Sequence, residues 1–143
     1  MSHDIVVGIG PAGSGHAAAH RAANLARALG AKVVLVFGYE SSSLGQRGGP
    51  LEEQVQEIAD EVTNELRAQL VLDFPDVVFE VELVRDRAVD SLIRVAEARN
   101  ADMIVVGHGG RGPMRAALLG STTYEIVHRA PIPVLVVPDP AED

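Results

Sequence analysis

Four residues in the last third of the sequence have the types and the spacing that an anion-binding site requires. Gly107 and Gly110 are separated by two residues, and nine residues separate Gly110 from the pair Gly120-Ser121. Glycine lets the backbone approach a ligand closely, and a helix N-terminus presents unpaired N–H groups with a partial positive charge. A glycine-rich loop that leads into a helix therefore predicts a cradle for phosphate.

Residues beside this motif offer further donors. Arg111 and Arg115 lie in the loop and could form charge-assisted hydrogen bonds with a polyphosphate. Ser121 is expected to cap the helix and to donate its hydroxyl, and Thr122 is expected to supply a backbone N–H. In the alternative interpretation, the glycines serve only the turns of a tight crossover and both arginines are solvated loop charges.

A second glycine cluster has the GxGxxG spacing of a dinucleotide site. It consists of Gly8, Gly10 and Gly13, follows an apolar run and opens a helix, with Glu40 beyond the next apolar run. In such sites an acidic residue follows the glycine motif by about 20 residues, and Glu40 lies farther than that from Gly13. No stretch remains for a substrate domain, so NAD or FAD is the less favoured ligand.

Catalytic and metal chemistry have little support in the sequence. Cysteine is absent, so thiolate chemistry and disulfides are excluded. There is no GxSxG motif and no carboxylate pair placed for acid–base work. His16 and His20 are four residues apart, but no third metal ligand is indicated and a solvated helix face explains them better. We therefore predict no catalytic residue and no metal ligand.

The remaining pattern indicates the elements that would position these loops. Short apolar runs predict strands, at residues 5–9, 33–37, 78–84, 103–107 and 134–137. Amphipathic stretches predict helices, at residues 15–29, 50–70, 86–100 and 121–129. The strict alternation predicts one α/β domain over residues 1–143, with a doubly wound parallel sheet and helices on both faces.

The third predicted strand, residues 78–84, alternates apolar and acidic side chains and therefore belongs at a sheet edge. The strand order that follows is 3-2-1-4-5, with a ligand crevice between strands 1 and 4 at their carboxyl ends. In the second helix a continuous apolar row is expected to face the sheet, formed by Leu51, Val55, Ile58, Val62, Leu66 and Leu70. Asp86 is expected to cap the third helix, and Gly30 and Asn100 are expected to end the first and third.

Composition restricts the partners. The formal net charge of −8 and the pI near 5.0 argue against nucleic acid, because no basic stripe is available to displace counterions. The first ten residues lack a basic and apolar leader, and no run approaches the roughly 18 apolar residues that span a bilayer. A cytoplasmic location without membrane contact is expected.

The spacing of Gly107, Gly110 and Gly120-Ser121 resembles the nucleotide-binding signature of the universal stress protein family, and the resemblance extends over the whole chain. It implies ATP binding, with slow hydrolysis at most, by residues at the carboxyl edge of the sheet. These residues are Ile9, Gly10, Gly38, Val106, Gly107, Gly110, Arg111, Gly120, Ser121 and Thr122.

Two positions depart from the family pattern. Gly10 stands where ATP-binding members usually carry an aspartate, so a carboxylate for the ribose or for Mg²⁺ is missing. Gly38 replaces the larger apolar residue often found beside adenine. We therefore expect weak metal dependence. A nucleotide-independent module that keeps the fold and has lost the ligand remains the alternative to an ATP-binding regulatory module acting in stress response.

The last predicted strand suggests how the chain assembles. Val134–Val137 is apolar throughout and would form the second sheet edge. Pro131, Pro133 and Pro138 flank it and restrict pairing to a short register. The family resemblance also implies dimers through this strand. We expect a homodimer in which two copies of the strand pair in antiparallel fashion about a two-fold axis.

Overall fold

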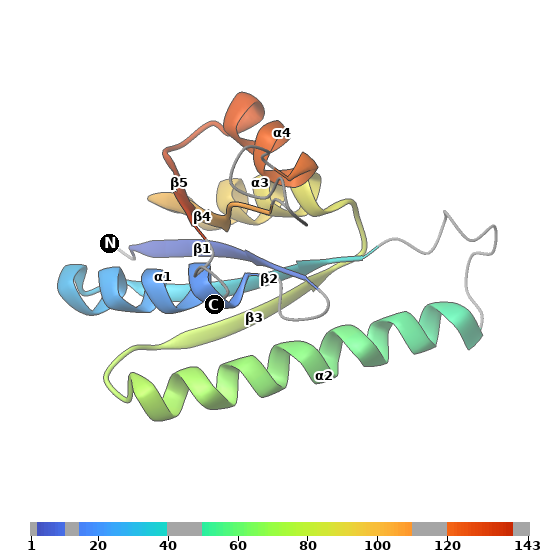
Figure 1. Cartoon of the computed structure of the whole chain (residues 1–143), viewed down its shortest axis with the longest axis horizontal. Coiled ribbons are helices and arrows are strands. Elements are labelled where there is room, and N and C mark those ends of the chain that lie inside the picture. Colours follow the sequence, from blue (N-terminus) through green and yellow to red (C-terminus); the bar gives the residue numbers. More distant parts are fainter. Residues whose placement is uncertain (1–2, 11–14, 40–49, 110–119, 139–143) are drawn as a thin grey trace.

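The structure is a computed structural model, and it describes residues 3–10, 15–39, 50–109 and 120–138 (Figure 1). Strands and helices alternate strictly along the chain, as predicted. In order they are β1 (Asp4–Ile9), α1 (His16–Leu29), β2 (Lys32–Gly38), α2 (Pro50–Asp73), β3 (Phe79–Val84), α3 (Ala88–Arg99), β4 (Met103–Gly107), α4 (Ser121–Arg129) and β5 (Val134–Val137).

The five strands form one parallel sheet in the order β3-β2-β1-β4-β5, which confirms the predicted order. β1 is central: Val6 lies opposite Val34 of β2 on one side and opposite Ile104 of β4 on the other. β2 and β4 carry almost only apolar residues because both faces of these strands are covered. The strand order reverses beside β1, so the predicted crevice lies at the carboxyl ends of β1 and β4.

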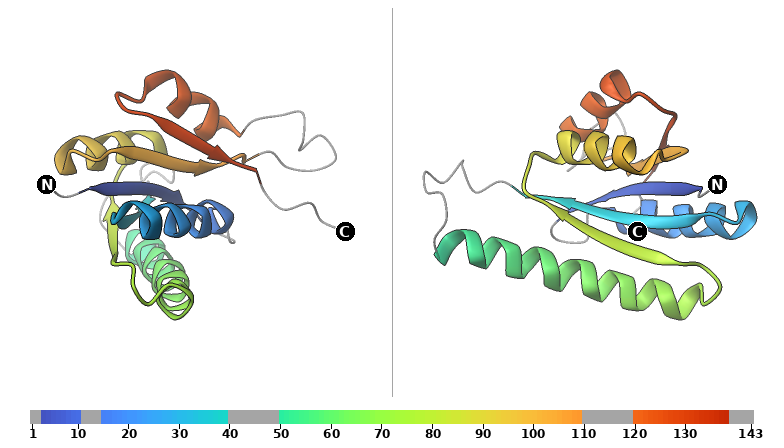
Figure 2. Two further views of the ribbon diagram at one scale, coloured as in Figure 1. Left: turned by 90° about the vertical axis from the view of Figure 1, so that its left-hand side faces the viewer. Right: turned by 180° about the vertical axis from the view of Figure 1, so that it is seen from behind.

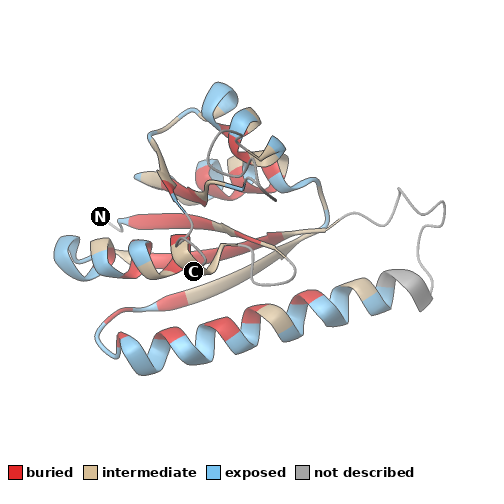
Figure 3. Cartoon of the chain, viewed as in Figure 1, coloured by how far each residue is buried: buried red, intermediate tan, exposed pale blue. Residues whose placement is uncertain are grey.

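Two helical layers cover the sheet, as the two views in Figure 2 show. Alternate residues of β1 serve opposite faces: Ile5 and Val7 belong to the core under α1 and α2, whereas Val6 belongs to the core under α3 and α4. Both cores are aliphatic, and the buried residues follow the strands and the inner faces of the helices (Figure 3). The alanine-rich inner face of α1 brings that helix close to the sheet.

The predicted apolar row of α2 is partly wrong. Leu66 and Leu70 are buried, but Ile58 is 53% exposed and the buried row continues instead through Ala59 and Thr63. Thr63 is accommodated because its hydroxyl donates to the Ala59 carbonyl oxygen at 2.8 Å within the helix. The small residues Ala59 and Thr63 let α2 approach the sheet closely. The prediction placed Ile58 in the buried row because it considered hydropathy alone and not side-chain size.

The predicted helix ends are correct at two positions and wrong at a third. Gly30 and Asn100 end α1 and α3 in the left-handed region, with φ of 68° and 53°. Asp86 does not cap α3, because the capping position is Arg87 and no side chain bonds there. The Asp86 carboxylate instead accepts the Arg87 N–H at 2.8 Å and the guanidinium of Arg94 at 2.6 Å.

Candidate functional site

The carboxyl ends of β1 and β4 lie side by side, because Val7 is in register with Val105 two residues before each strand ends. β1 leads through Gly10 toward α1, and β4 leads through Gly107 toward α4. The first turns of both helices therefore begin at the edge where the strand order reverses. This is the place at which open parallel sheets bind ligands.

The two described ends of the segment between β4 and α4 are joined to each other. The N–H of Gly120 donates to the His108 carbonyl oxygen at 3.0 Å, and the hydroxyl of Thr123 donates to the Gly107 carbonyl oxygen at 2.6 Å. Gly109 adopts a φ of +79° and its backbone packs directly on Gly120. We call residues 107–109 and 120–123 the neck of the loop.

Close backbone packing in the neck explains why glycine occupies position 120. A Cβ placed on Gly120 would lie 2.8 Å from the Gly109 carbonyl oxygen and 2.9 Å from the Gly109 Cα, both shorter than real contacts allow. Position 109 needs glycine as well, because its φ lies in the region that other residues rarely adopt. Two glycines therefore let β4 and α4 meet at backbone contact.

The first turn of α4 presents backbone donors at this edge. Gly120, not Ser121, is the capping residue, and no side-chain hydrogen bond caps it, so the prediction for Ser121 as the cap is wrong. Ser121 is instead the first helical residue, with an exposed side chain. Within the described residues, the N–H groups of Ser121, Thr122 and Thr123 have no backbone acceptor. The first N–H groups of a helix generally lack an acceptor within the helix, so an anion can accept hydrogen bonds from these three groups.

The other predicted site residues divide into three groups. Ile9 and Val106 are buried in the cores on opposite faces of the sheet, so only their backbone can face a ligand. Gly10 and Gly38 lie at the carboxyl ends of β1 and β2 and are half-buried. Outside the described residues lie Gly110, Arg111, Arg115, Gly13 and Glu40.

The structure supplies a reason for glycine at position 38. A Cβ there would lie 2.5 Å from the Ser91 hydroxyl and 3.1 Å from both the Asp86 carbonyl oxygen and the Ala88 Cα. Ser91 is fully buried and donates its hydroxyl to the Arg87 carbonyl oxygen at 2.8 Å. The start of α3 thus occupies the space that a larger side chain at position 38 would need.

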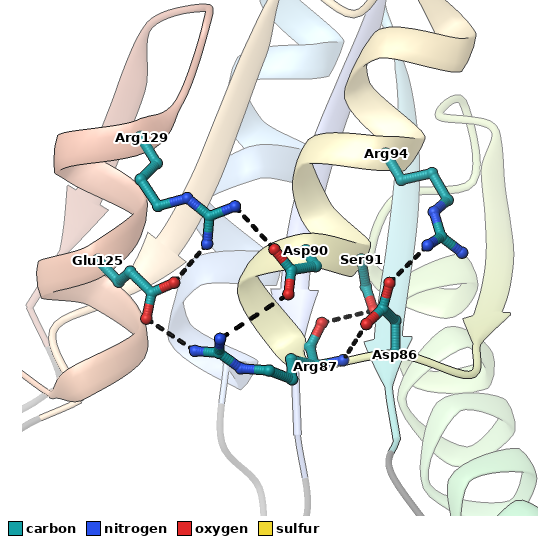
Figure 4. A network of polar contacts seen from close by, with 7 residues as sticks. All are labelled: Asp86, Arg87, Asp90, Ser91, Arg94, Glu125 and Arg129. Carbon is teal, nitrogen blue, oxygen red and sulfur yellow. Dashed lines mark hydrogen bonds and ion pairs between the residues drawn. The ribbon is translucent and has the colours of Figure 1, made fainter.

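A ring of ion pairs holds α4 against α3 (Figure 4). From α4, Arg129 donates to Asp90 at 2.8 Å and also bonds Glu125. From the start of α3, Arg87 donates to Glu125 at 2.9 Å and its guanidinium lies 4.0 Å from the Asp90 carboxylate. Two guanidinium groups and two carboxylates thereby alternate around the ring, so no like charges are left facing each other unopposed.

We expect this ring to make a pH-dependent contribution to stability. The hydrogen bond from Arg129 holds the pKa of Asp90 below its ordinary value of 3.8. A carboxyl group whose pKa is lower in the folded than in the unfolded state stabilises the folded protein above its unfolded pKa, which is about 3.9 for aspartate. This stabilisation is lost as the pH falls through the pKa of the folded state. Arg129→Met should lower the melting temperature at pH 7 by a few degrees at most, because all these side chains are partly exposed.

Thermal unfolding in low salt between pH 7 and pH 3 tests this expectation. The difference between wild type and Arg129→Met should shrink as Asp90 becomes protonated. It should also shrink in 1 M salt, where the Debye length is about 3 Å. A difference that stays constant across this pH range would show that Arg129 acts through packing rather than charge.

Sequence reasoning left His108 either near the ligand or on a surface loop, and it missed Thr123. His108 contributes its backbone, because its N–H donates to the Val137 carbonyl oxygen at 2.9 Å while its carbonyl accepts from Gly120. Thr123 contributes a buried hydroxyl, and its signal in the sequence was a polar residue on the apolar side of α4, one turn before Ile126. Among the described residues, no group of three or more His, Cys, Asp or Glu is arranged for a metal ion. No helix in the same part of the chain is long and apolar enough to cross a membrane.

Comparison with known proteins agrees with this geometry. The family model described as the universal stress protein family matches residues 1–138. A universal stress protein of Thermus aquaticus is 32% identical over 127 residues, which cover 87% of this chain and 92% of the relative.

Two solved structures extend the comparison. A universal stress protein from Archaeoglobus fulgidus superposes with a TM-score of 0.78 at 21% identity, covering 96% of this chain and 99% of that one. A universal stress protein in complex with cAMP superposes with a TM-score of 0.63 at 26% identity, covering 96% and 98%. The sequence match over nearly the full length and the shared fold lead to one conclusion: the chain belongs to the universal stress protein family.

Proposed function

We propose that this protein is an ATP-binding regulatory module that acts in the stress response. The observation that carries the proposal is the neck: two glycines in backbone contact bring the N–H groups of the α4 first turn, which have no backbone acceptor among the described residues, to the edge between β1 and β4. Three neighbouring amide donors at a helix start suit a phosphate group. The related structure with cAMP bound supports a nucleotide as the ligand in this family.

The same geometry favours binding over catalysis. Gly10 provides no carboxylate at the end of β1, so position 10 offers no side-chain acceptor to a ribose hydroxyl or a divalent ion. Gly38 provides no side chain at the end of β2, because the start of α3 fills that space. The phosphate end of the site therefore supplies most of the proposed binding energy, and hydrolysis would be slow.

The alternative function is a nucleotide-independent dimeric module of the same fold. Gly10 and Gly38 favour it, because both remove side chains that would hold the nucleoside. Release of nucleotide from the purified protein distinguishes the two functions. Denaturation followed by mass spectrometry should detect ATP if the first proposal holds, and should detect none if the alternative holds.

ATP is expected to raise the melting temperature. At a concentration about 100 times the dissociation constant, binding to the folded state alone stabilises it by about 2.7 kcal/mol. For a domain of this size that corresponds to a rise of roughly 8 °C. Differential scanning fluorimetry with ATP up to millimolar concentration measures the shift.

Two ligands serve as controls for this titration. Tripolyphosphate should produce part of the shift because it occupies the α4 donors, whereas adenosine should produce little because it lacks the phosphates. Repeating the ATP titration with and without Mg²⁺ should change the affinity little, since Gly10 leaves no carboxylate for the ion. If millimolar ATP gives no shift, the nucleotide-independent alternative gains support.

A further inference from the structure

Thr123 is a buried polar residue that directly links a helix to a strand of the sheet. Thr123 is 3% exposed and lies in the first turn of α4. The hydroxyl donates to the Gly107 carbonyl oxygen, the last of β4, at 2.6 Å. The Thr123 hydroxyl oxygen also lies 3.3 Å from the position that a Cβ on Gly109 would take, so the Thr123 side chain packs against the left-handed turn.

This hydrogen bond acts together with a second one. The Gly120 N–H donates to the His108 carbonyl oxygen at 3.0 Å, so consecutive carbonyls of β4 and its turn accept from α4 and its capping residue. A single hydrogen bond lets the helix pivot about it, whereas two bonds at different points set its direction. In the described part of the chain, removal of the Thr123 hydroxyl would leave the Gly120–His108 bond as the one hydrogen bond across the neck.

The other contacts of α4 constrain its direction less. Ile126 is fully buried and anchors the helix in the core, but an apolar contact allows rotation. The ion pairs of Glu125 and Arg129 with α3 are partly exposed, and such pairs are weak and screened by salt. The direction in which the α4 N–H groups point therefore depends largely on Thr123.

We propose that Thr123 is a positioning residue for the phosphate cradle. Its hydroxyl holds the first turn of α4 against β4, so that the N–H groups of this turn are already directed at the crevice before a ligand arrives. The expected effect on nucleotide affinity rests on the proposed function. The fixed direction of α4 rests on the two hydrogen bonds of the neck. Preorganised donors bind more tightly because no ordering is needed on binding.

Thr123→Val tests this proposal because valine keeps the shape and removes the hydroxyl. Isothermal titration calorimetry with ATP should show about a tenfold loss of affinity, the usual size of the effect of one buried hydrogen bond. Thr123→Ser keeps the hydroxyl and should stay within about twofold of wild type. Thr63→Val is the matched control: Thr63 is equally buried and donates within α2, so its loss should lower the melting temperature without changing the affinity.

A second measurement does not need a ligand. Amide hydrogen exchange of the free protein should be faster at Tyr124 in Thr123→Val, because the Tyr124 N–H bonds to Gly120 across the loosened turn. Exchange at Tyr124 should be unchanged in Thr63→Val and close to wild type in Thr123→Ser. Exchange at Tyr124 therefore reports whether the Thr123 hydroxyl holds the first turn of α4 against β4.

The combined results separate the two proposals. If wild type binds no ATP, the proposed function is overturned, and exchange at Tyr124 alone decides whether Thr123 holds the first turn of α4 against β4. If wild type binds ATP and Thr123→Val binds it equally well, the positioning role is overturned even when exchange is faster. If Thr123→Ser loses as much affinity as Thr123→Val, the hydroxyl is not the cause.

Discussion

Replacing Gly120 with valine is expected to abolish ATP binding and to lower the free energy of unfolding by about 1–3 kcal/mol. Any Cβ at this position would lie 2.8–3.0 Å from backbone atoms of Gly109, which cannot rotate out of the way. The neck must open to admit the side chain, and the first turn of α4 then moves away from the crevice. Chemical denaturation and calorimetry with ATP measure the two effects.

Gly30→Val is the control for this substitution. Gly30 has a positive φ of 68°, unlike Gly120 with its φ of −63°, and nothing lies within 4 Å of a Cβ there, so the cost at position 30 is backbone strain alone. The Gly30 variant should lose stability and keep its affinity for ATP. If Gly120→Val folds and responds to ATP like wild type, the assignment of the cradle to the α4 first turn is wrong.

Two copies of the protein are expected to pair through β5, giving a two-fold symmetric dimer at micromolar concentration. Among the strands that the structure describes, β5 lies at the edge of the sheet and pairs only with β4. The carbonyl of Pro133, just before β5, accepts from Ile104 of β4, and the carbonyl of Val137 accepts from His108, just after β4, at 2.9 Å each. Because successive residues alternate, Val134 and Val136 direct their N–H and C=O groups to the open side.

Antiparallel pairing would satisfy these outward groups. With a two-fold axis through Leu135, Val134 of one copy faces Val136 of the other and the pair can exchange hydrogen bonds. Val134, Leu135 and Val136 are half-buried, so the partner would also cover apolar surface. An uncovered edge of this composition would otherwise promote aggregation.

Val136→Pro is a selective test of this dimer. Proline removes the outward N–H and leaves the hydrogen bonds to β4 in place, because residue 136 does not donate to β4. In a two-fold dimer the substitution removes one intermolecular hydrogen bond from each copy, so two are lost. The dissociation constant should therefore rise roughly 30–150-fold. Sedimentation equilibrium measures it, and Val136→Lys should weaken the dimer as well.

Leu72→Lys is the control, since Leu72 is 82% exposed near the end of α2 and distant from β5 in the strand order. This variant should remain a dimer. A monomer mass for the wild-type chain at micromolar concentration would overturn the prediction. Equal dissociation constants for wild type and Val136→Pro would place the contact on another surface.

The fold followed from local patterns because each element carries its own signal. Central strands such as β2 are apolar on both faces, and β3 alternates because it lies at an edge, which was enough to order the sheet. Helix ends with a backbone signal were also predicted, as Gly30 and Asn100 show. Ends that depend on side-chain geometry were not: the capping positions of α3 and α4 are Arg87 and Gly120 rather than Asp86 and Ser121.

The sequence by itself determined the element order, the parallel sheet and the glycine spacing, because hydropathy period and glycine position act over a few residues. The tertiary structure alone decided what those glycines contact, since Gly120 meets Gly109 and Gly38 meets Ser91 across gaps in the sequence. It also decided that Thr123 faces Gly107 rather than solvent. Such contacts depend on how closely two elements approach, and that distance is set by the packing of the whole core rather than by any local pattern.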